Sequence, residues 1–407
     1  MLGLWKQLRG SLDARSSGKS GGHESGIPAC KDCPKTRLAH LANERSPRET
    51  AKSQATSGAR RMNELETEKY QGHDSAMAWT PPPERVGLVT LIARIFAEAS
   101  SKCGAFEWIA LGYLGFSSML VALFAENLAH PVRLVSTQAL VAAMILLLCR
   151  AGGRARKLPN SVDLAFSAKF WHFWRHWYPH LFLIFCFEEL GSLVHLVDPG
   201  WEDAKLMAFD RWLTGVNPPL WFEHLVHPAL TEFMEFSYFT YFVYLLILGG
   251  VLYFERDREA YWSAMTYSVI GYVFGYVIAM LFPAESPYFT LAGQWHRALT
   301  GGPFTGLVML IEKYGRVHGA AFPSQHVAGA MAALWGAWRH RRWLFWIFLP
   351  FVACMCVSTV YVRNHYMADV LGGLVTGTLG YFLGCRLMKL DRARERAADR
   401  ATTRGGH

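Results

Sequence analysis

Two short polar segments interrupt the apolar second half of the chain, at residues 323–326 and 363–369. His365 and Asp369 are four residues apart, so on one helical turn they share a face and the carboxylate can accept the imidazole Nδ1 proton. The other ring nitrogen, Nε2, is then free to act as a base or a nucleophile. His326 lies in the first turn of the helix opened by the other segment, where it can act as a general acid toward a leaving oxygen.

The same segments carry groups that suit an anion. Ser324 follows a proline and is a good N-cap, so backbone amides around Ser324 and Gln325 and the positive end of a helix dipole face one pocket. Such a helix start favours phosphate above other anions. A planar guanidinium fork and further cations can bind phosphate oxygens as well. The cationic candidates for phosphate binding are Arg363, Arg316 and Lys313.

Each of these residues has an ordinary explanation when it is taken alone. An interfacial histidine is usually a hydrogen-bonded residue of the polar and aromatic belt, and an arginine at the end of a span usually extends its charge to water. Ionisable groups are nevertheless costly at this depth. The combination of two histidines, a carboxylate and a helix start on one face therefore indicates an active site.

The composition predicts the elements that must hold these residues. Hydrophobic residues make up 52% of the 407 residues and charged residues 18%, yet about the first eighty positions are polar. The apolar residues are concentrated downstream, which predicts an integral membrane protein. The net charge of +9 comes from cations beside apolar segments, so no nucleic-acid partner is expected. Cys30 and Cys33 have the spacing of half a zinc site, but no second pair follows, so no metal or other cofactor is expected.

Hydrophobic runs, measured against the roughly 20 residues that a helix needs to cross a bilayer, give about eight spans. The expected spans are residues 107–127, 133–149, 179–197, 233–254, 262–282, 325–338, 343–362 and 368–388. The fold class is therefore all-α, a polytopic membrane helix bundle. The span at 325–338 is short, and we expect it to begin inside a cavity that protein lines.

Clusters of arginine and lysine follow alternate spans, and the positive-inside rule places those ends in the cytoplasm. The clusters are Arg150, Arg154, Arg156 and Lys157; Arg256 and Arg258; Arg339, Arg341 and Arg342; and Arg386, Lys389 and Arg392. Eight spans with both termini in the cytoplasm satisfy this bias. Both polar segments are then expected on the opposite face, which is periplasmic, extracellular or lumenal.

The chain divides into four expected regions. Residues 1–85 have no sustained hydrophobic period and end in a proline-rich break, so we expect a disordered cytoplasmic tail. Residues 86–160 carry two additional spans, and residues 161–390 carry the six that include the polar segments. Residues 391–407 are expected to form a basic cytoplasmic tail.

Residues 323–326 and 358–369 resemble the second and third signature motifs of the type 2 phosphatidic acid phosphatase superfamily. The resemblance implies that His365 attacks phosphorus to form a phosphohistidine, that Asp369 supports it, and that His326 protonates the leaving group. It also implies a six-helix core that needs no metal. That core would correspond to the spans from about 179 to 388.

This chain departs from the usual motifs at one arginine. The third motif usually has arginine where Thr359 stands, and Arg363 comes two positions before the histidine instead. The first motif, a lysine followed later by Arg-Pro, is not cleanly present. Residues 322–324 and 361–366 look more like the inositol phosphorylceramide synthase branch of the superfamily. Residues 209–213 and 238–241 are similar to that branch as well.

We therefore expect a membrane enzyme that moves phosphate, or a phosphorylated head group, of a lipid phosphate or phospholipid. Transfer of phosphoinositol or a similar head group to a lipid alcohol would make it a transferase. Reaction with water would make it a lipid phosphate phosphatase, acting on phosphatidic acid or an isoprenyl pyrophosphate. The alternative of a different class is a non-catalytic membrane protein that binds or transports an anion.

Overall fold

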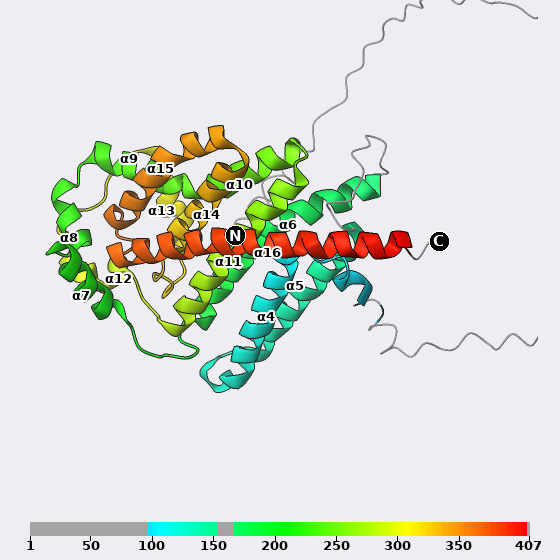
Figure 1. Cartoon of the computed structure of the whole chain (residues 1–407). Helices are drawn as coiled ribbons and strands as arrows, with labels where there is room; N and C mark the ends of the chain where they lie inside the picture. Colours follow the sequence, from blue (N-terminus) through cyan, green and yellow to red (C-terminus); the bar gives the residue numbers. More distant parts are fainter. Residues whose placement is uncertain (1–93, 95–96, 153–165, 405–407) are drawn as a thin grey trace, which may run out of the picture. The chain divides into compact units, whose positions relative to one another are not determined.

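The structure is a computed structural model and describes residues 94, 97–152 and 166–404. Within these residues the chain is helical, and extended pairing is limited to one isolated bridge between Ala284 and Ala320. The fold is an all-α polytopic membrane helix bundle, as the sequence predicts (Figure 1). The expected tail of residues 1–85, with Cys30 and Cys33, lies outside the described residues.

The described helices include long membrane-length segments and shorter ones that connect some of them. They are α4 (Ala105–Leu123), α5 (Pro131–Gly152), α6 (Phe166–Leu193), α7 (Asp203–Thr214), α8 (Pro218–Phe222), α9 (Pro228–Phe239), α10 (Tyr241–Phe254), α11 (Arg258–Leu281), α12 (Pro287–Thr290), α13 (Pro303–Gly315), α14 (Gln325–His340), α15 (Arg342–Tyr361) and α16 (Met367–Arg404). Short 3₁₀ helices are η1 (Ala125–Asn127), η2 (Glu223–Leu225) and η3 (Ala292–Gln294).

Within the described part of the chain, six helical segments are long and apolar enough to cross a membrane. They are Ala105–Leu123, Pro131–Gly152, Pro228–Phe254, Arg258–Leu281, Arg342–Tyr361 and Met367–Ala397. Each coincides with an expected span, and α9 and α10 together form one of them. The expected spans at 179–197 and 325–338 are helical too but fall outside this set. The reason is that the apolar part of α6 contains His176, His180, Glu188 and Glu189, while α14 has only 16 residues.

Two helices are longer than the sequence pattern indicates. α16 continues to Arg404, through residues that were expected to form a separate basic tail. α6 begins at Phe166, well before the expected start of its span, and it continues through Pro179. The run of apolar residues therefore predicts the membrane part of each helix but not the polar turns that extend it.

The short helix α14 is enclosed by other helices. It packs against α10, α11, α15 and α16, and most of its residues from Gln325 to Ala337 are buried. A helix surrounded by protein does not need to match the thickness of the lipid, because its ends can lie below the lipid surface. This surrounding explains how a short segment can belong to the bundle, as the sequence predicts.

Glycines of α16 bring it very close to α14. A Cβ added to Gly373 would lie 2.5 Å from the carbonyl oxygen of Ser324, and one added to Gly377 would lie 2.5 Å from that of Ala328. Both distances are far below van der Waals contact, so only glycine allows the two backbones to approach in this way. The start of α14 is thereby fixed against the start of α16, and these two helix starts contain the polar segments.

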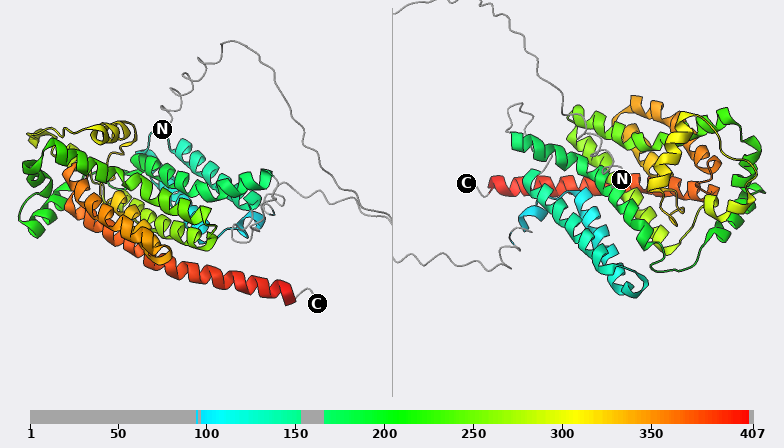
Figure 2. Two further views of the ribbon diagram at one scale, coloured as in Figure 1. Left: turned by 90° about the horizontal axis from the view of Figure 1, so that it is seen from above. Right: turned by 180° about the vertical axis from the view of Figure 1, so that it is seen from behind.

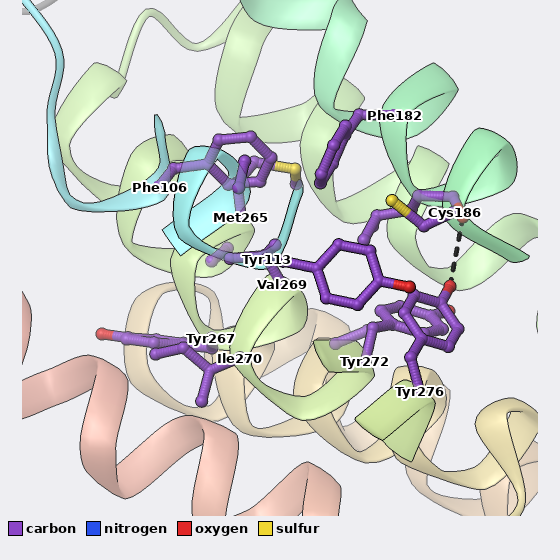
Figure 3. Packing of buried hydrophobic residues seen from close by; sticks show 14 of the residues in the cluster. Phe106, Tyr113, Phe182, Cys186, Met265, Tyr267, Val269, Ile270, Tyr272 and Tyr276 are labelled. Carbon is purple, nitrogen blue, oxygen red and sulfur yellow. Dashed lines mark hydrogen bonds between the residues drawn. The ribbon is translucent and has the colours of Figure 1, made fainter. Parts of the chain in front are cut away.

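The first two expected spans pack against the rest of the bundle through aromatic residues. α5 contacts α4 and α6, and α4 also contacts α11 and α16. The ring centroid of Phe106 in α4 lies 6.1 Å from that of Phe182 in α6 and 5.9 Å from that of Trp262 in α11. Figure 3 shows this cluster, in which Tyr113 of α4 also lies against Tyr276 of α11.

Short helices lie at the end of the bundle where α16 begins. Figures 1 and 2 show α7 and α8 at this end, and α7 contacts α16. Helix α7 is amphipathic: Asp203 and Asp210 are buried, while Phe209 and Trp212 are 40% and 78% exposed. An exposed aromatic face on a short helix is typical of a helix that lies in the membrane interface.

Candidate active site

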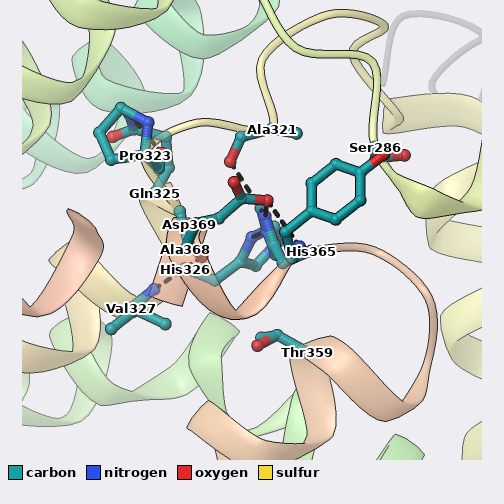
Figure 4. A network of polar contacts seen from close by, with 12 residues as sticks. Ser286, Ala321, Pro323, Gln325, His326, Val327, Thr359, His365, Ala368 and Asp369 are labelled. Atoms are coloured by element: carbon teal, nitrogen blue, oxygen red, sulfur yellow. Dashed lines mark hydrogen bonds and ion pairs between the residues drawn. The ribbon is translucent and has the colours of Figure 1, made fainter. Parts of the chain in front are cut away.

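The two polar segments meet at this end of the bundle. Nδ1 of His326, in the first turn of α14, lies 3.1 Å from Nε2 of His365, in the loop between α15 and α16. The backbone N–H of Ser324 donates to the carbonyl of Asp369 over 2.9 Å, which joins the two helix starts. Figure 4 shows both histidine rings beside Asp369. The loop charges predict that both polar segments lie on one face of the membrane, and in the structure side chains of the two segments are in contact.

His365 is oriented by two acceptors. Its Nδ1 lies 3.0 Å from the carbonyl oxygen of Ala321 and 3.3 Å from Oδ2 of Asp369. A carbonyl oxygen only accepts hydrogen bonds, so Nδ1 carries the proton of the neutral ring and Nε2 carries the lone pair. The N–H of Ala321 donates to the carbonyl of Ala284 over 3.1 Å, which holds this acceptor in place. The expected contact with Asp369 is present, and Ala321 is a nearer partner that spacing could not predict.

His365 is 4% exposed. Burial lowers the pKa of its imidazole to about 3; the Ala321 carbonyl opposes this, and the guanidinium of Arg316 acts in the same direction as burial. The ring therefore stays neutral, with its Nε2 lone pair, through the neutral and mildly acidic range.

His326 lies between His365 and two tyrosines. Its Nε2 is 2.8 Å from the hydroxyl oxygen of Tyr238, and its ring centroid is 4.9 Å from that of Tyr238 and 4.5 Å from that of Tyr241. Because Nε2 of His365 holds a lone pair, the N–H in the contact between the two histidines belongs to Nδ1 of His326. Nε2 of His326 then accepts the hydrogen bond of the Tyr238 hydroxyl.

Asp369 combines two tasks. It is fully buried, and its Oδ2 accepts the backbone N–H of Tyr366 over 2.8 Å, which is how an acid in the first turn caps a helix. The same oxygen faces Nδ1 of His365. The start of α16 and the orientation of the imidazole are therefore fixed by one carboxylate.

The other predicted phosphate ligands differ in their surroundings. Ser324 caps α14 as expected, with its Oγ accepting the N–H of Val327 over 3.4 Å. The side chain of Gln325 is buried against Gly275 of α11. Lys313 is exposed on α13. The capacity of this helix start to hold an anion therefore rests on the N–H groups of its first turn, which have no acceptor inside the helix.

Arg316, at the end of α13, is the predicted cation whose charge acts on His365. Its guanidinium pairs with Glu312 and lies 4.0 Å from the ring centroid of Tyr288. Glu312 also accepts from Nδ2 of Asn364 over 2.5 Å. Since Asn364 precedes His365, this chain of contacts joins Arg316 to the loop that carries the nucleophile candidate.

Arg363 ends α15 in a left-handed conformation, with φ of 68°. Its N–H donates to the carbonyl of Val360, and the N–H of Asn364 donates to that of Thr359, both over 3.1 Å. These are the two bonds of a Schellman motif, in which the left-handed position is usually glycine. An arginine with this backbone conformation indicates that its side chain has a task.

The guanidinium of Arg363 is held by protein groups. It donates to the carbonyl of Arg297 over 2.5 Å, lies 3.5 Å from Oε1 of Glu223, and lies 4.1 Å from the ring centroid of Trp295. Burial lowers its pKa, and the carboxylate of Glu223 opposes that effect. Arg363 thus anchors the segment before α13, and its contact with phosphate stays a prediction.

Two carboxylates of α7 were not among the predicted site residues. Asp210 accepts the N–H of Met367 over 2.9 Å and that of Ala368 over 2.8 Å. Asp203 accepts the hydroxyl of Tyr366 over 2.9 Å. All three partners belong to the segment that contains His365 and begins α16. Helix α7 therefore holds the segment that carries the candidate nucleophile.

A signal for these two acids was present in the sequence. Asp203 and Asp210 are seven residues apart, which is about two helical turns, so both lie on the buried face of an amphipathic helix. Burial raises the pKa of Asp210, and the N–H groups of Met367 and Ala368 oppose that effect. A carboxylate is favourable here because the N-terminus of a helix carries partial positive charge.

The arrangement combines the groups that nucleophilic displacement at phosphorus requires: a neutral imidazole, an N–H donor facing it, and a helix start that attracts anions. In-line attack places phosphorus about 3 to 3.5 Å from the attacking atom. The nitrogens of His326 and His365 are 3.1 Å apart, so His326 must move away from His365 when a phosphate enters.

Residues 204–383 match the PAP2 superfamily in a comparison with known protein families. The matched range runs from α7 into α16 and includes His326, His365 and Asp369. The match supports the resemblance to the type 2 phosphatidic acid phosphatase superfamily, and with it a function of the lipid phosphatase or phosphotransferase kind. No curated protein and no solved structure matches the chain.

Proposed function

Starting from the match of residues 204–383 to the PAP2 superfamily, we propose that this membrane protein moves a phosphate-containing group of a lipid through a covalent phosphohistidine at His365. The observation that carries the proposal is the 3.0 Å contact between Nδ1 of His365 and the carbonyl of Ala321. With its proton held there, the ring presents the Nε2 lone pair toward His326, which can serve as the acid for the leaving group.

The reaction consists of two displacements at phosphorus. In the first, Nε2 of His365 forms the N–P bond, the P–O bond to the leaving group breaks, and protonated His326 gives a proton to the leaving oxygen. In the second, the oxygen of water or an alcohol forms the new P–O bond, the N–P bond breaks, and His326 takes the proton of the attacking hydroxyl. Asp369 stabilises the positive charge on the phosphorylated ring from 3.3 Å.

The phosphate is proposed to lie at the start of α14, where backbone N–H groups and the helix dipole attract an anion. Arg316 adds a positive charge that acts on His365. Arg363 becomes a second cationic ligand when phosphate replaces its contacts with Glu223 and Arg297. All these groups belong to the protein, so the proposed reaction is written without a metal or other cofactor, as the resemblance implies.

A covalent intermediate can pass its phosphorus group to an alcohol instead of water, and the same catalytic residues serve both reactions. We therefore propose phosphoinositol, or a similar head group, as the group that is transferred, and a lipid alcohol as its acceptor. The resemblance of residues 322–324 and 361–366 to the inositol phosphorylceramide synthase branch supports this choice.

The test uses purified protein with labelled phosphatidic acid and phosphatidylinositol, each with and without ceramide or diacylglycerol. A new phospholipid that requires the alcohol supports transfer. Free phosphate, or free inositol phosphate, from either donor instead indicates a lipid phosphatase. No product with any donor would contradict catalysis and favour an anion-binding or transport protein.

Two variants assign the roles of the histidines. His365→Ala should abolish turnover and the acid-labile phosphoenzyme, and normal turnover would contradict the nucleophile assignment. His326→Ala should slow a lipid phosphate more than a substrate with a very good leaving group, because such a group needs little protonation. His224→Ala, at an exposed histidine, is the matched control and should keep normal turnover.

A further inference from the structure

We propose that Tyr238 is the positioning residue for His326, and that its hydroxyl changes from hydrogen-bond donor to acceptor when His326 becomes charged. The inference rests on the proposed function, because it assigns a partner to the leaving-group acid of that reaction. Its geometric basis is the 2.8 Å contact between the Tyr238 hydroxyl and Nε2 of His326.

Tyr238 is a firmly held partner. Its side chain is 3% exposed, and its ring centroid lies 4.9 Å from that of His326. It belongs to α9, which packs against α13 and α15, and thus lies between the helix that carries Arg316 and the helix that leads to His365. The phenol therefore approaches His326 from a fixed direction, on the side of the ring away from His365.

A single arrangement of protons satisfies the whole row of contacts when both histidines are neutral. Nδ1–H of His365 donates to the Ala321 carbonyl, Nδ1–H of His326 donates to Nε2 of His365, and the Tyr238 hydroxyl donates to Nε2 of His326. Reversing either bond of His365 would leave the Ala321 oxygen facing a lone pair, and reversing the Tyr238 bond alone would leave the lone pairs of the two histidines facing each other. The resting state of His326 is therefore the tautomer with its proton on Nδ1.

Protonation of His326 changes what the ring requires. The imidazolium has an N–H at both nitrogens, so Nε2–H now needs an acceptor, and a buried N–H without one is costly. The Tyr238 oxygen has lone pairs and can accept this bond after rotation of its own O–H, with no movement of the ring. Phenylalanine at this position could offer neither role.

Because Nε2 of His326 stays bound to Tyr238, Nδ1 is the nitrogen that gives protons to the reacting oxygens and takes protons from them. In the first displacement the imidazolium gives its Nδ1 proton to the leaving oxygen, and the ring stays neutral with its remaining proton on Nε2, bound to Tyr238. In the second, the Nδ1 lone pair takes the proton of the attacking hydroxyl, which restores the imidazolium. One proton is given and one is received, so a complete transfer returns His326 to the imidazolium with which the first displacement begins. The proton that charges the resting ring comes from solvent when the anionic phosphate binds.

The neighbouring tyrosines provide a matched control. Tyr241 also packs on His326, with ring centroids 4.5 Å apart, but its hydroxyl bonds to that of Tyr272 over 2.9 Å. Tyr272→Phe therefore removes a buried hydroxyl near the same tyrosines, and this hydroxyl does not bond to a nitrogen of His326. Tyr238→Phe removes the one that bonds to Nε2.

The experiment compares Tyr238→Phe, Tyr272→Phe and the unchanged protein, all purified, for a phospholipid donor and for a p-nitrophenyl phosphate ester. For Tyr238→Phe we expect kcat on the phospholipid to fall about tenfold or more, a part of the effect of a general acid, with KM nearly unchanged. The nitrophenyl ester should lose less than about threefold, because its leaving group needs no proton. The alkaline-side decline of the rate should also begin at lower pH, because the charged form of His326, which the first displacement needs, is less stable.

Three results would overturn the inference. The first is an equal loss on both substrates, which would indicate a general structural role, and a thermal midpoint for each variant measures any such damage. The second is a Tyr238→Phe variant that behaves like Tyr272→Phe on both substrates. The third is the absence of a His365-dependent phosphoenzyme in the unchanged protein, which overturns the proposed function together with the role of Tyr238. In the first two cases only the inference about Tyr238 fails.

Discussion

The carboxylate of Asp210 lies 2.8 Å from the backbone nitrogen of Ala368, in the first turn of the helix that carries Asp369. The N–H of Met367 donates to the other oxygen of Asp210 over 2.9 Å. An amphipathic helix with an exposed aromatic face thus holds the helix start on which the His365 contact with Asp369 depends. Displacement of α7 would move the nucleophile candidate, although none of its residues contacts the imidazole among the contacts described.

Asp210→Asn should separate this support from the chemistry. The amide keeps the size of the side chain but turns an NH₂ group toward one of the two backbone donors. We expect a loss of stability of about 1 kcal/mol, typical of a lost cap, and a loss of turnover of up to about 10²-fold through misplacement of His365. Turnover assays and thermal unfolding in detergent measure the two effects.

Asp198→Asn is the control for this change. Asp198 also accepts a backbone N–H, that of Gly200 over 2.8 Å, but in an exposed loop. It should leave turnover unchanged. Equal turnover of the Asp210 and Asp198 variants would show that α7 does not position the site.

The sequence predicted the parts of the fold and site that depend on local periodicity. His365 and Asp369 are one helical turn apart, so their contact follows from spacing alone, and the membrane spans follow from runs of apolar residues. The alternation of loop charges placed residues 323–326 and 363–369 on one face of the bundle, and in the structure these segments are in contact.

What the sequence missed are contacts that leave no periodic pattern. Asp210 binds backbone N–H groups more than 150 positions away, and any residue type can supply such groups. The acceptor nearest to His365 is likewise a backbone oxygen, that of Ala321. The present partners of the Arg363 guanidinium, the carbonyl of Arg297 and the carboxylate of Glu223, were not predicted either, because side-chain direction at a helix end depends on the backbone conformation.

The buried pair of Arg175 and Glu107 joins α6 to α4, and their side chains are 3% and 1% exposed. Arg175→Met should destabilise the protein by about 3 to 5 kcal/mol, because it leaves the Glu107 carboxylate buried without its cation. The double variant Arg175→Met with Glu107→Gln should recover much of that loss, since neither remaining group is charged. Thermal unfolding of the three proteins in detergent measures the comparison, and a double variant as unstable as the single one would contradict it.

The lowered pKa of His365 predicts how stability depends on pH. Its folded-state pKa is about 3 and the unfolded value is about 6.5, so the unfolded chain binds a proton here first as the pH falls. The contribution of this residue is complete above pH 6.5 and is lost progressively below it. His365→Gln should therefore make the decline in thermal midpoint between pH 7 and pH 4.5 smaller than in the unchanged protein.

His224→Gln, at an exposed histidine, is the control for this measurement and should keep the decline of the unchanged protein. The sign of the difference is the decisive observation. A steeper decline in His365→Gln would mean that protonation of His365 stabilises the fold, which would contradict a pKa lowered by burial.

Arg363 allows backbone strain and side-chain function to be measured at one position. Its φ of 68° costs an ordinary residue roughly 1 to 2 kcal/mol but costs glycine almost nothing. Arg363→Gly and Arg363→Ala both remove the guanidinium and its contacts with Arg297 and Glu223. Only the glycine also removes the strain, so Arg363→Gly should be more stable than Arg363→Ala by about 1 kcal/mol.

The turnover of the two Arg363 variants should not follow the order of their stability. If the guanidinium binds phosphate during the reaction, both variants should lose activity to the same extent, even though the glycine variant is the more stable of the two. The loss should appear as a raised KM for the phosphorylated donor. Thermal unfolding and steady-state kinetics of the two variants, measured side by side, separate the contributions. An alanine variant as stable as the glycine variant would show that the left-handed backbone carries no strain, and normal KM in both would remove Arg363 from the phosphate ligands.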